Sequence, residues 1–429
     1  MGFRALPLGW ELKTLDDIAQ SDYGLVDGPF GSNLPASCYV PSGIPVIRGS
    51  NLSLGEVSFK GDDFVYVSEE TAKRLARSLC GPEDIVLTKK GTLGQTGFVP
   101  ENHRYKQFLI SSNQMKLSVN RDVADPRFVY YYVSSPMSRE KIIRDSEVTG
   151  VPKTNLAYLK TFPILLPSLD EQKEIAHILG TLDDKIELNQ QMNRTLEGIA
   201  RALFKSWFID FDPVRAKLDG RQPYRMDAET AALFPDSFDD SPLGKIPKGW
   251  RVGRLDDLII LQRGFDLPKT NRTSGKYPVL AASGPSGTHN EYKVKGPGIT
   301  TGRSGVLGNI FFVHEDFWPL NTSLWVKEFR ESRPIHTYYV LQDLNLEVFN
   351  AGSAVPTLNR NHVHGLKVVI PPLPVIEVFE SLVMLIFQKK KANDEESIDI
   401  SAVRDVLLPK LLSGEIRVKD AEQALEAVA

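Results

Sequence analysis

This sequence contains a degenerate second copy of its own first part. Four phrases recur in the same order: Gly-Trp with Leu-Asp-Asp at 8–18 and 247–258, a glycine phrase at 91–99 and 305–313, Pro with Tyr-Tyr at 126–131 and 334–339, and Val-Pro-x-x-Asn at 151–155 and 355–359. The offset between matching phrases falls from 240 to 204, so one copy gained or lost residues in its interior. We expect two versions of one scaffold, with chance similarity of glycine and aromatic phrases as the alternative.

Within each copy, short runs of β-branched and aromatic residues lie between Gly, Pro and Asn, a pattern typical of short strands. Such runs are found at 44–47, 84–88, 310–313 and 323–326. An aromatic segment follows in each copy, at 128–133 and 337–341, and we expect it to be helical. The sequence therefore predicts an α+β fold for each copy.

Each copy is followed by a long amphipathic segment. In the first, 170–208, apolar residues recur at spacings of three, four and seven, which predicts a helix of roughly 60 Å. The second runs from Val375 to Leu411 with a polar interruption at 389–396. We expect Pro409 to kink this helix and Gly414 to end it.

Neither amphipathic segment has a partner nearby in the sequence, so we expect the two to pack against each other as antiparallel helices. Asn189 and Asn193 fall in the apolar seam, where polar residues fix one register and one partner. Two ordinary core helices of unrelated domains are the alternative. The segment 209–244 between the copies is acidic and contains several prolines, which predicts an exposed linker that a partner protein would order.

The charge of the chain is distributed unevenly. A formal net charge of -3 argues against nucleic-acid binding, but residues 1–165 and 245–370 carry +1 and +6, and residues 166–244 and 371–429 carry -6 and -4. The two cysteines, Cys38 and Cys80, follow no metal or disulfide spacing, which favours a reducing compartment. With no apolar run long enough to span a bilayer, we expect a cytoplasmic protein without a membrane partner.

These phrases resemble those of the specificity subunits of type I restriction-modification enzymes, over essentially the whole chain. Each half opens with a Gly-Trp and Leu-x-Asp phrase, at Gly9-Trp10 and Gly249-Trp250. A proline-rich strand end enters a helix with Glu-Gln at 166–172, and the two long helices end on similar phrases at 203–208 and 407–416. Pro374-Val375-Ile376-Glu377 departs from the Glu-Gln expected at the start of the second helix, which puts the docking of a modification subunit there in doubt.

The resemblance implies an α+β protein with two tandem pseudo-symmetric target-recognition domains, separated by two long antiparallel helices that form a coiled-coil spacer. The expected boundaries are 1–165 and 245–370 for the domains, 166–210 and 371–429 for the central and distal spacer helices, and 211–244 for the linker. Each domain would bind half of a bipartite, asymmetric site on double-stranded DNA. Two modification subunits would dock on the helices with S-adenosylmethionine, and restriction subunits would bring ATP and Mg²⁺, so this chain itself would hold no cofactor.

The residues favour a chain without a catalytic site of its own. There is no phosphate-binding GxxxxGK[ST] loop and no Asn-Pro-Pro-aromatic phrase of an amino-methyltransferase. Asn361-His362-Val363-His364 has no acidic or thiol companions at ligand spacing, so we expect no metal site, and Glu291-Tyr292-Lys293 is only a fragment of a nuclease motif. A stand-alone nuclease or methyltransferase, and a two-module protein-interaction scaffold, are the competing functions.

Base edges are read by Arg or Lys at guanine and by Asn or Gln at adenine, presented from loops on a rigid scaffold. In the first copy the candidates surround the glycine phrase: Arg48, Asn51, Lys89, Lys90, Thr92, Gln95, Asn113 and Gln114. In the second copy they are Arg263, Arg272, Arg303, Ser304, Asn309, Asn321 and Arg360. Gly91 and Gly305 would let the backbone approach a phosphate closely.

Overall fold

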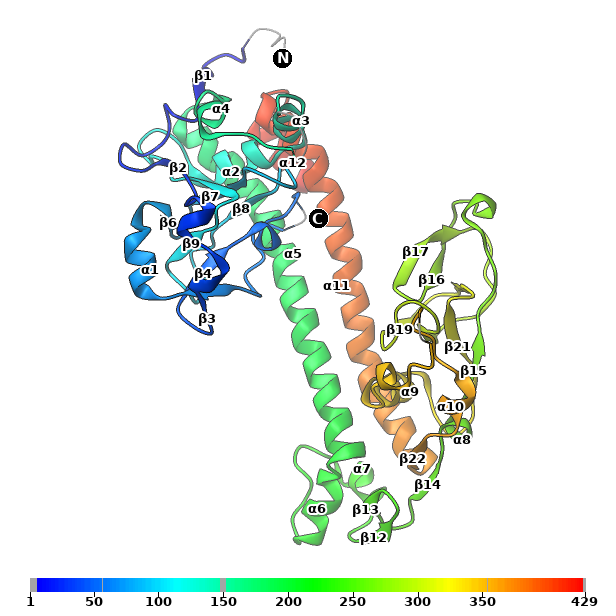
Figure 1. Cartoon of the computed structure of the whole chain (residues 1–429). Coiled ribbons are helices and arrows are strands. Elements are labelled where there is room, and N and C mark those ends of the chain that lie inside the picture. Colours follow the sequence, from blue (N-terminus) through cyan, green and yellow to red (C-terminus); the bar gives the residue numbers. More distant parts are fainter. Residues whose placement is uncertain (1–5, 56, 147–151, 353, 427–429) are drawn as a thin grey trace. The chain divides into compact units, whose positions relative to one another are not determined.

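The structure is a computed structural model that describes residues 6–55, 57–146, 152–352 and 354–426 (Figure 1). It divides into two compact units: unit 1 comprises Met1–Gln191 with Asp394–Ala429, and unit 2 comprises Met192–Asn393. Each unit holds one copy of the repeat together with a stretch of both long helices. Val151, which opens the last phrase of the first copy, lies outside the described residues.

The described residues of unit 1 form three sheets and a set of short helices. Its strands are β1 (Glu11–Thr14), β2 (Leu25–Asp27), β3 (Tyr39–Val40), β4 (Ile44–Ile47), β5 (Val65–Val67), β6 (Leu79–Cys80), β7 (Ile85–Thr88), β8 (Thr96–Phe98), β9 (Phe108–Ile110), β10 (Gln114–Leu117) and β11 (Pro163–Leu166). Its short helices are α1 (Glu69–Arg74), α2 (Pro126–Ser134), α3 (Pro136–Arg144), α4 (Leu156–Lys160) and α12 (Val418–Glu426). The sheets have the orders β1-β11, β2-β10-β7-β8 and β3-β5-β4-β9-β6.

In unit 2 the residues that the structure describes form four sheets. Its strands are β12 (Phe238–Ser241), β13 (Gly244–Pro247), β14 (Arg251–Arg254), β15 (Ile259–Arg263), β16 (Tyr277–Ala281), β17 (Gly284–His289), β18 (Gly298–Gly302), β19 (Ile310–Val313), β20 (Trp318–Pro319), β21 (Ser323–Phe329) and β22 (Lys367–Ile370). Its short helices are α6 (Asp212–Leu218), α7 (Ala228–Ala232), α8 (Leu255–Leu258), α9 (Pro334–Asp343) and α10 (Arg360–His364). The sheets have the orders β12-β13, β14-β22, β15-β21-β18-β19 and β17-β16-β20.

The duplication predicted from the sequence is confirmed by the topology. The antiparallel pair β1-β11 corresponds to β14-β22, and the four-stranded sheet β2-β10-β7-β8 corresponds to β15-β21-β18-β19. The interiors differ, because the first copy adds the five-stranded sheet and the second adds the three-stranded one. The strands and aromatic helices expected in each copy are all present, and the α+β class is confirmed.

The two long helices are α5 (Leu169–Phe204), followed by a π-helical turn (Lys205–Ile209), and α11 (Leu373–Ser413). The polar stretch 389–396 interrupts the apolar pattern but not the helix, which runs through this stretch and through Pro409. Gly414, at φ +69, ends it as predicted: its N–H bonds to Leu411 O and that of Glu415 to Lys410 O, at 3.2 and 2.9 Å.

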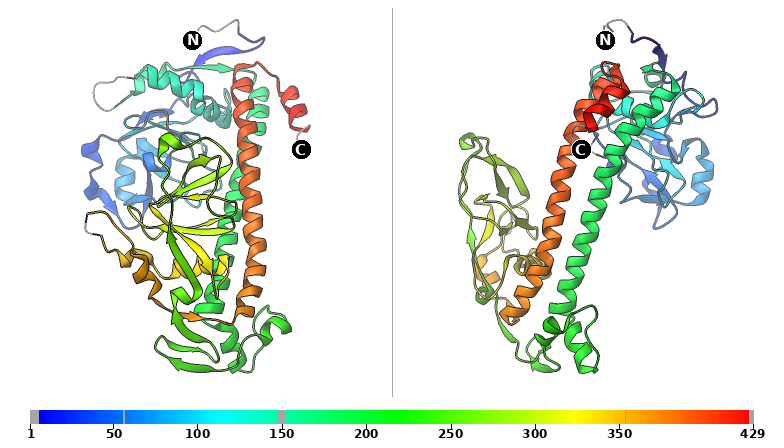
Figure 2. Two further views of the ribbon diagram at one scale, coloured as in Figure 1. Left: turned by 90° about the vertical axis from the view of Figure 1, so that its right-hand side faces the viewer. Right: turned by 180° about the vertical axis from the view of Figure 1, so that it is seen from behind.

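Within each unit the two helices lie side by side and antiparallel (Figure 2). In unit 1, Asn189 is 1% exposed and donates to Glu396 and Ser397 of α11, at 2.9 and 3.3 Å. In unit 2, Asn393 is fully buried and donates to Asn193 at 2.8 Å. The polar stretch of α11 therefore supplies the partners of the seam asparagines, which is how polar seam residues specify one register.

An aromatic helix of each copy docks on these helices. In unit 1 the Tyr131 hydroxyl of α2 donates to Asp183 of α5 at 2.7 Å, and Asp183 pairs with Arg404 of α11, also at 2.7 Å. Burial, and then the negative charge of Asp183, raise the pKa of the Tyr131 phenol well above its usual value, so the hydroxyl stays a donor. In unit 2 the corresponding Tyr339 donates to Glu197 at 3.1 Å.

The start of each aromatic helix explains the departure from Glu-Gln at Pro374 to Glu377. Gln172 is 1% exposed: its Nε2 donates to Pro167 O at 3.0 Å and its Oε1 accepts from the Asp125 N–H at 2.9 Å. In unit 2 the buried Ile376 takes the place of the glutamine. Glu380, one turn later, accepts from the N–H groups of Ile335 and His336 instead, at 2.9 to 3.1 Å. Glu380 thus compensates inside unit 2 for the loss of the glutamine, so the departure from Glu-Gln is explained without a partner subunit.

The segment 209–244 is folded, whereas we expected an exposed linker. It forms α6, α7 and the β12-β13 hairpin. Phe211, Val214 and Phe234 are buried in one cluster with Trp207 and Trp250. Its many acidic side chains lie outside this cluster. Because they dominate the composition of the segment, composition alone predicted an exposed linker.

Candidate nucleic-acid interface

The glycine phrase forms an equivalent loop in each unit: glycine loop 1 is residues 89–95 and glycine loop 2 is residues 303–309. Backbone hydrogen bonds hold loop 1, among them those from Lys89 N to Asn113 O, from Gly91 N to Pro152 O and from Thr154 N to Lys89 O, at 2.7, 3.2 and 2.9 Å. Equivalent bonds hold loop 2, from Arg303 N to Thr322 O, from Gly305 N to Pro356 O and from Leu358 N to Arg303 O, at 2.8, 2.9 and 2.8 Å. The two loops therefore share one backbone but carry different side chains.

Glycine is required in these loops for conformational reasons. Gly91 and Gly305 have φ of +110 and +95, in the region that favours glycine. A Cβ atom on either of them would meet nothing within 4 Å, so the backbone is open on that side. The backbone at these glycines can therefore be approached closely from outside, and the predicted phosphate contact stays a prediction.

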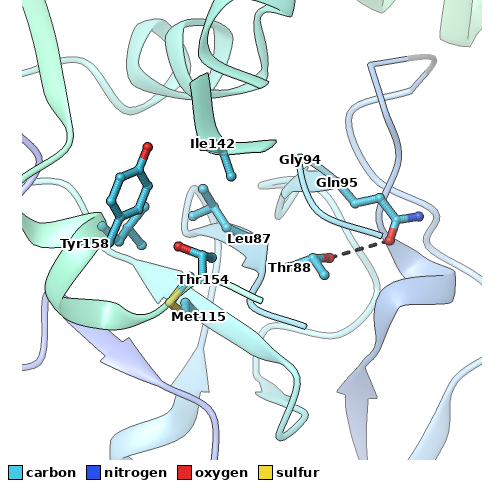
Figure 3. Close-up of a pocket in the computed structure, with 9 residues that line it drawn as sticks. Leu87, Thr88, Gly94, Gln95, Met115, Ile142, Thr154 and Tyr158 are labelled. Atoms are coloured by element: carbon cyan, nitrogen blue, oxygen red, sulfur yellow. Dashed lines mark hydrogen bonds between the residues drawn. The ribbon is translucent and has the colours of Figure 1, made fainter. Parts of the chain in front are cut away.

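The side chains of loop 1 vary in exposure. Lys90 and Thr92 are exposed, whereas Lys89 is half-buried and pairs with Asp27 at 3.0 Å. Gln95 is half-buried, 3.5 Å from the Thr88 hydroxyl. Figure 3 shows Gln95 on the other side of Thr88 from Tyr158, and all three residues line a small, mainly apolar hollow behind the loop.

The candidates that neighbour loop 1 in the sequence separate into two groups. Gly49, the residue after Arg48, lies against the side chains of Gln95 and Gln114, and Asn113 is exposed. The structure thus brings these residues to one place beside the loop. Gln114 itself is 2% exposed and accepts a hydrogen bond from the Ser111 hydroxyl, so it forms the floor of this place.

Asn51 does not fit the predicted role. It is 1% exposed, its Oδ1 accepts from Arg48 N at 3.0 Å, and its Nδ2 donates to Lys60 O and Asp62 O at 3.2 and 3.0 Å. All of its hydrogen-bonding groups are used inside the fold, so we leave it out of the interface.

Glycine loop 2 gathers a second group of candidates. Arg303 Nε donates to Asn321 O at 3.0 Å, and Asn321 Nδ2 donates to Asp266. Asp266 also lies 3.6 Å from Arg263, which is exposed. Ser304 is half-buried and Asn309 is exposed in the loop itself.

The last two candidates of the second copy lie elsewhere. Arg272 donates to Ser286 O at 2.6 Å and to Ser286 Oγ at 3.3 Å, so its guanidinium joins two segments of unit 2 and is left out of the interface. Arg360 is exposed at the first position of α10, shortly after Thr357, which forms an isolated β-bridge with Ser304 of loop 2.

Two residues that the sequence reasoning missed also lie at the loops: Asp27, beside Lys89, and Asp266, beside Arg263. A signal for Asp27 was present in the sequence, because a charged residue followed by glycine occurs at equivalent positions of the two copies, as Asp27-Gly28 and as Arg263-Gly264.

The residues considered for chemistry have structural partners. His364 Nε2 accepts from Leu261 N at 2.9 Å, and burial lowers the pKa of this imidazole. Lys293 lies 4.8 Å from the centre of the Trp318 ring. Within the described residues, no group of three or more His, Cys, Asp or Glu side chains is placed to hold a metal ion. A search of the same residues finds no helix with the length and apolar character needed to span a bilayer.

Comparison with known proteins gives one consistent family. A sequence profile described as "Type I restriction modification DNA specificity domain" matches residues 7–198 and 247–393. The chain is similar to the type I restriction enzyme MjaIX specificity subunit of Methanocaldococcus jannaschii, with 25% identity over 444 residues, 97% of this chain and 95% of that protein. It is also similar to the type I restriction enzyme HindI specificity subunit of Haemophilus influenzae, with 27% identity over 405 residues, 76% of this chain and 87% of that protein.

A solved structure shows the same fold. The S subunit of the type I restriction-modification system of M. genitalium superposes with a TM-score of 0.59 at 18% identity, covering 94% of this chain and 96% of that one. The duplicated sheets, the paired helices and a sequence profile that matches most of the chain all point to the same family. The chain therefore belongs to the family of type I restriction-modification DNA specificity subunits.

Proposed function

We propose that this chain is the DNA-reading subunit of a type I restriction-modification complex and that it recognises a bipartite, asymmetric site on double-stranded DNA. One half-site is read by unit 1 through glycine loop 1 and the other by unit 2 through glycine loop 2. The single observation that carries the proposal is the shared backbone of the two loops with unlike side chains. Two equal scaffolds with different base-reading groups suit two half-sites of different sequence.

The chemistry of the loop residues supports this assignment. Loop 1 offers Lys90, Thr92 and Gln95, and loop 2 offers Arg303, Ser304 and Asn309, which together cover the donors and acceptors that discriminate base edges in the major groove. The positively charged segments 1–165 and 245–370 contain these loops, so phosphate contacts would be concentrated where bases are read. We list the proposed interface as Arg48, Lys89, Lys90, Thr92, Gln95, Asn113 and Gln114 in unit 1, and Arg263, Arg303, Ser304, Asn309, Asn321 and Arg360 in unit 2.

The long helices offer surfaces for partner subunits. In unit 1 the apolar side chains of Leu188, Ile398 and Val406 are 53%, 68% and 58% exposed. In unit 2 those of Ile199, Leu382 and Leu385 are 52%, 47% and 64% exposed. We assign the two modification subunits to these helices, one in each unit, where a protein partner would cover the exposed apolar side chains.

The reactions belong to the partners in this proposal. The modification subunits would bring S-adenosylmethionine for adenine methylation, and restriction subunits would bring ATP and Mg²⁺ for translocation and cleavage. This chain would bind and orient the DNA, and the antiparallel helices would fix the gap between the half-sites.

The proposal is tested by mapping methylated adenines in cells that express this chain with its modification subunits. We expect one motif with two defined parts separated by an undefined gap of constant length. Binding of the purified complex to a duplex with that motif should weaken steeply with salt, with a slope set by the number of phosphate contacts. A protein-interaction scaffold would give neither result, and a stand-alone enzyme would act on DNA without the partner subunits.

A further inference from the structure

The residue that ends β2 occupies the same place in unit 1 as the residue that ends β15 in unit 2. Asp27 pairs with Met115 across the sheet, and Arg263 pairs with the corresponding Leu324. The next residue is a glycine in both cases: Gly28 N donates to Gln114 O at 2.9 Å, and Gly264 N donates to Ser323 O at 3.0 Å.

These glycines hold the preceding side chain in a fixed place. A Cβ atom on Gly28 would lie 1.9 Å from Ser111 O, and one on Gly264 would lie 2.2 Å from Leu320 O. No other residue is accommodated there without moving the backbone, because the contact is with main-chain atoms. Asp27 and Arg263 are therefore pinned beside their glycine loops by the same close approach.

The charge at this place is reversed between the two units. In unit 1 Asp27 Oδ2 lies 3.0 Å from Lys89 Nζ, with side-chain exposures of 29% and 28%. Asp27 Oδ1 is enclosed, so Oδ2 is the oxygen that can face outward. In unit 2 the same place holds the cation Arg263, which is 53% exposed and lies 3.6 Å from Asp266.

A carboxylate oxygen next to an ammonium presents an acceptor and donors side by side. In the major groove, guanine offers the N7 and O6 acceptors and its partner cytosine offers the N4 amino donor, and these are the groups that Lys and Asp recognise. Building on the proposed function, we propose that Lys89 and Asp27 together read one G·C base pair of the half-site of unit 1, with Lys89 on guanine and Asp27 on the cytosine amino group. Unit 2, with Arg263 at this place, makes no corresponding cytosine contact.

The experiment compares the motifs methylated by complexes that contain the wild-type chain, Asp27→Asn or Lys89→Met. We expect both variants to lose discrimination at the same single G·C position of one half-site, by about 5- to 150-fold in binding to matched duplexes. Asp27→Asn also leaves Lys89 able to contact a phosphate. The variant complex should therefore bind random DNA more tightly, and the slope of its log binding constant against log salt concentration should steepen by about one. Asp266→Asn, the acid beside Arg263, is the matched control and should leave that position unchanged.

The outcomes separate this inference from the proposed function. A wild-type motif with two defined halves, together with variants that keep the motif unchanged or relax different positions, overturns the Lys89 and Asp27 pairing alone. A unit 1 half-site without any G·C pair has the same consequence. A wild-type complex that methylates without sequence preference overturns the proposed function as well. Because the Lys89 side chain is 28% exposed and not part of the core, Lys89→Met keeps the test decisive if Asp27→Asn fails to fold.

Discussion

Replacing Asp183 by asparagine removes the charge that joins the first copy of the repeat to both long helices in unit 1. The Asp183 carboxylate accepts from the Tyr131 hydroxyl of α2 and pairs with Arg404 of α11, both at 2.7 Å. The side chains of Asp183 and Arg404 are only 16% and 11% exposed. Asp184, the next residue, also faces a cation, Arg127, but its side chain is 63% exposed.

The structure sets the expected size of the effect. Breaking a buried ion pair by removing one charge costs about 3 to 5 kcal/mol, because the other charge stays buried. Here Arg404 keeps a second partner, Asp405, at 2.9 Å, and asparagine can still accept one hydrogen bond. We therefore expect Asp183→Asn to lower the free energy of unfolding of unit 1 by about 2 to 3 kcal/mol. Asp184→Asn should cost less than about 1 kcal/mol, since its pair is largely exposed.

Hydrogen exchange of peptides that cover α2 gives the free energy of local opening in the intact chain, and urea unfolding gives the global value. Protection of residues 126–134 should fall in Asp183→Asn and stay near the wild-type value in Asp184→Asn. Equal losses in the two variants, or no loss in either, would refute the claim that the buried contact holds α2 on the helices.

Three further predictions concern the start of the aromatic helices, a buried histidine and a loop arginine. Gln172→Leu and Glu380→Leu should each lower stability by about 1 to 3 kcal/mol in urea unfolding, because the first removes the acceptor of the Asp125 N–H at the N-cap of α2 and the second that of the Ile335 N–H in α9; equal stability of wild type and variants would contradict this. Burial lowers the pKa of His336 to about 3 from a usual 6.5, so the unfolded state takes up the proton first and unit 2 loses stability as the pH falls below 6.5. At pH 4.5 the free energy of unfolding of unit 2 should be lower by about 2 to 3 kcal/mol, as measured by tryptophan fluorescence during unfolding. His336→Gln should show a smaller pH dependence than wild type. Arg303→Ala should relax one base of one half-site at a cost of about 1 to 3 kcal/mol in binding, and an unchanged methylation motif with unchanged affinity would remove Arg303 from the interface.

Much of the fold was accessible from the sequence because the duplication repeats local signals. The Gly-Trp and glycine phrases recur since the same backbone is needed twice, as the positive φ of Gly9 and Gly249, +82 in both, illustrates. Asn189 and Asn193 stood out as polar positions in an apolar seam, and the structure supplies their partners. Those partners lie about 200 residues away, in the stretch 389–396, which local polarity alone marked as an interruption.

The site was less accessible, because the role of a polar residue depends on contacts that are distant in the sequence. Asn51 and Arg272 have the residue types that read bases, but main-chain carbonyls in the fold occupy their donors. Asp27 was missed for the opposite reason: an acid is not expected at a DNA interface until its place beside Lys89 is known. The burial of Phe211 and Phe234 was also not predicted, because the segment 209–244 around them is rich in acidic residues and proline.

The central claim, that each unit reads its own half of the DNA site, is tested most directly by exchanging residues 20–150 for the same region of a relative with a different known motif. The hybrid is expressed with the modification subunits, and the methylated adenines are mapped. We expect one half of the motif to change to that of the donor protein, while the other half and the gap length stay as they were. A motif in which both halves change, or neither does, would contradict the account.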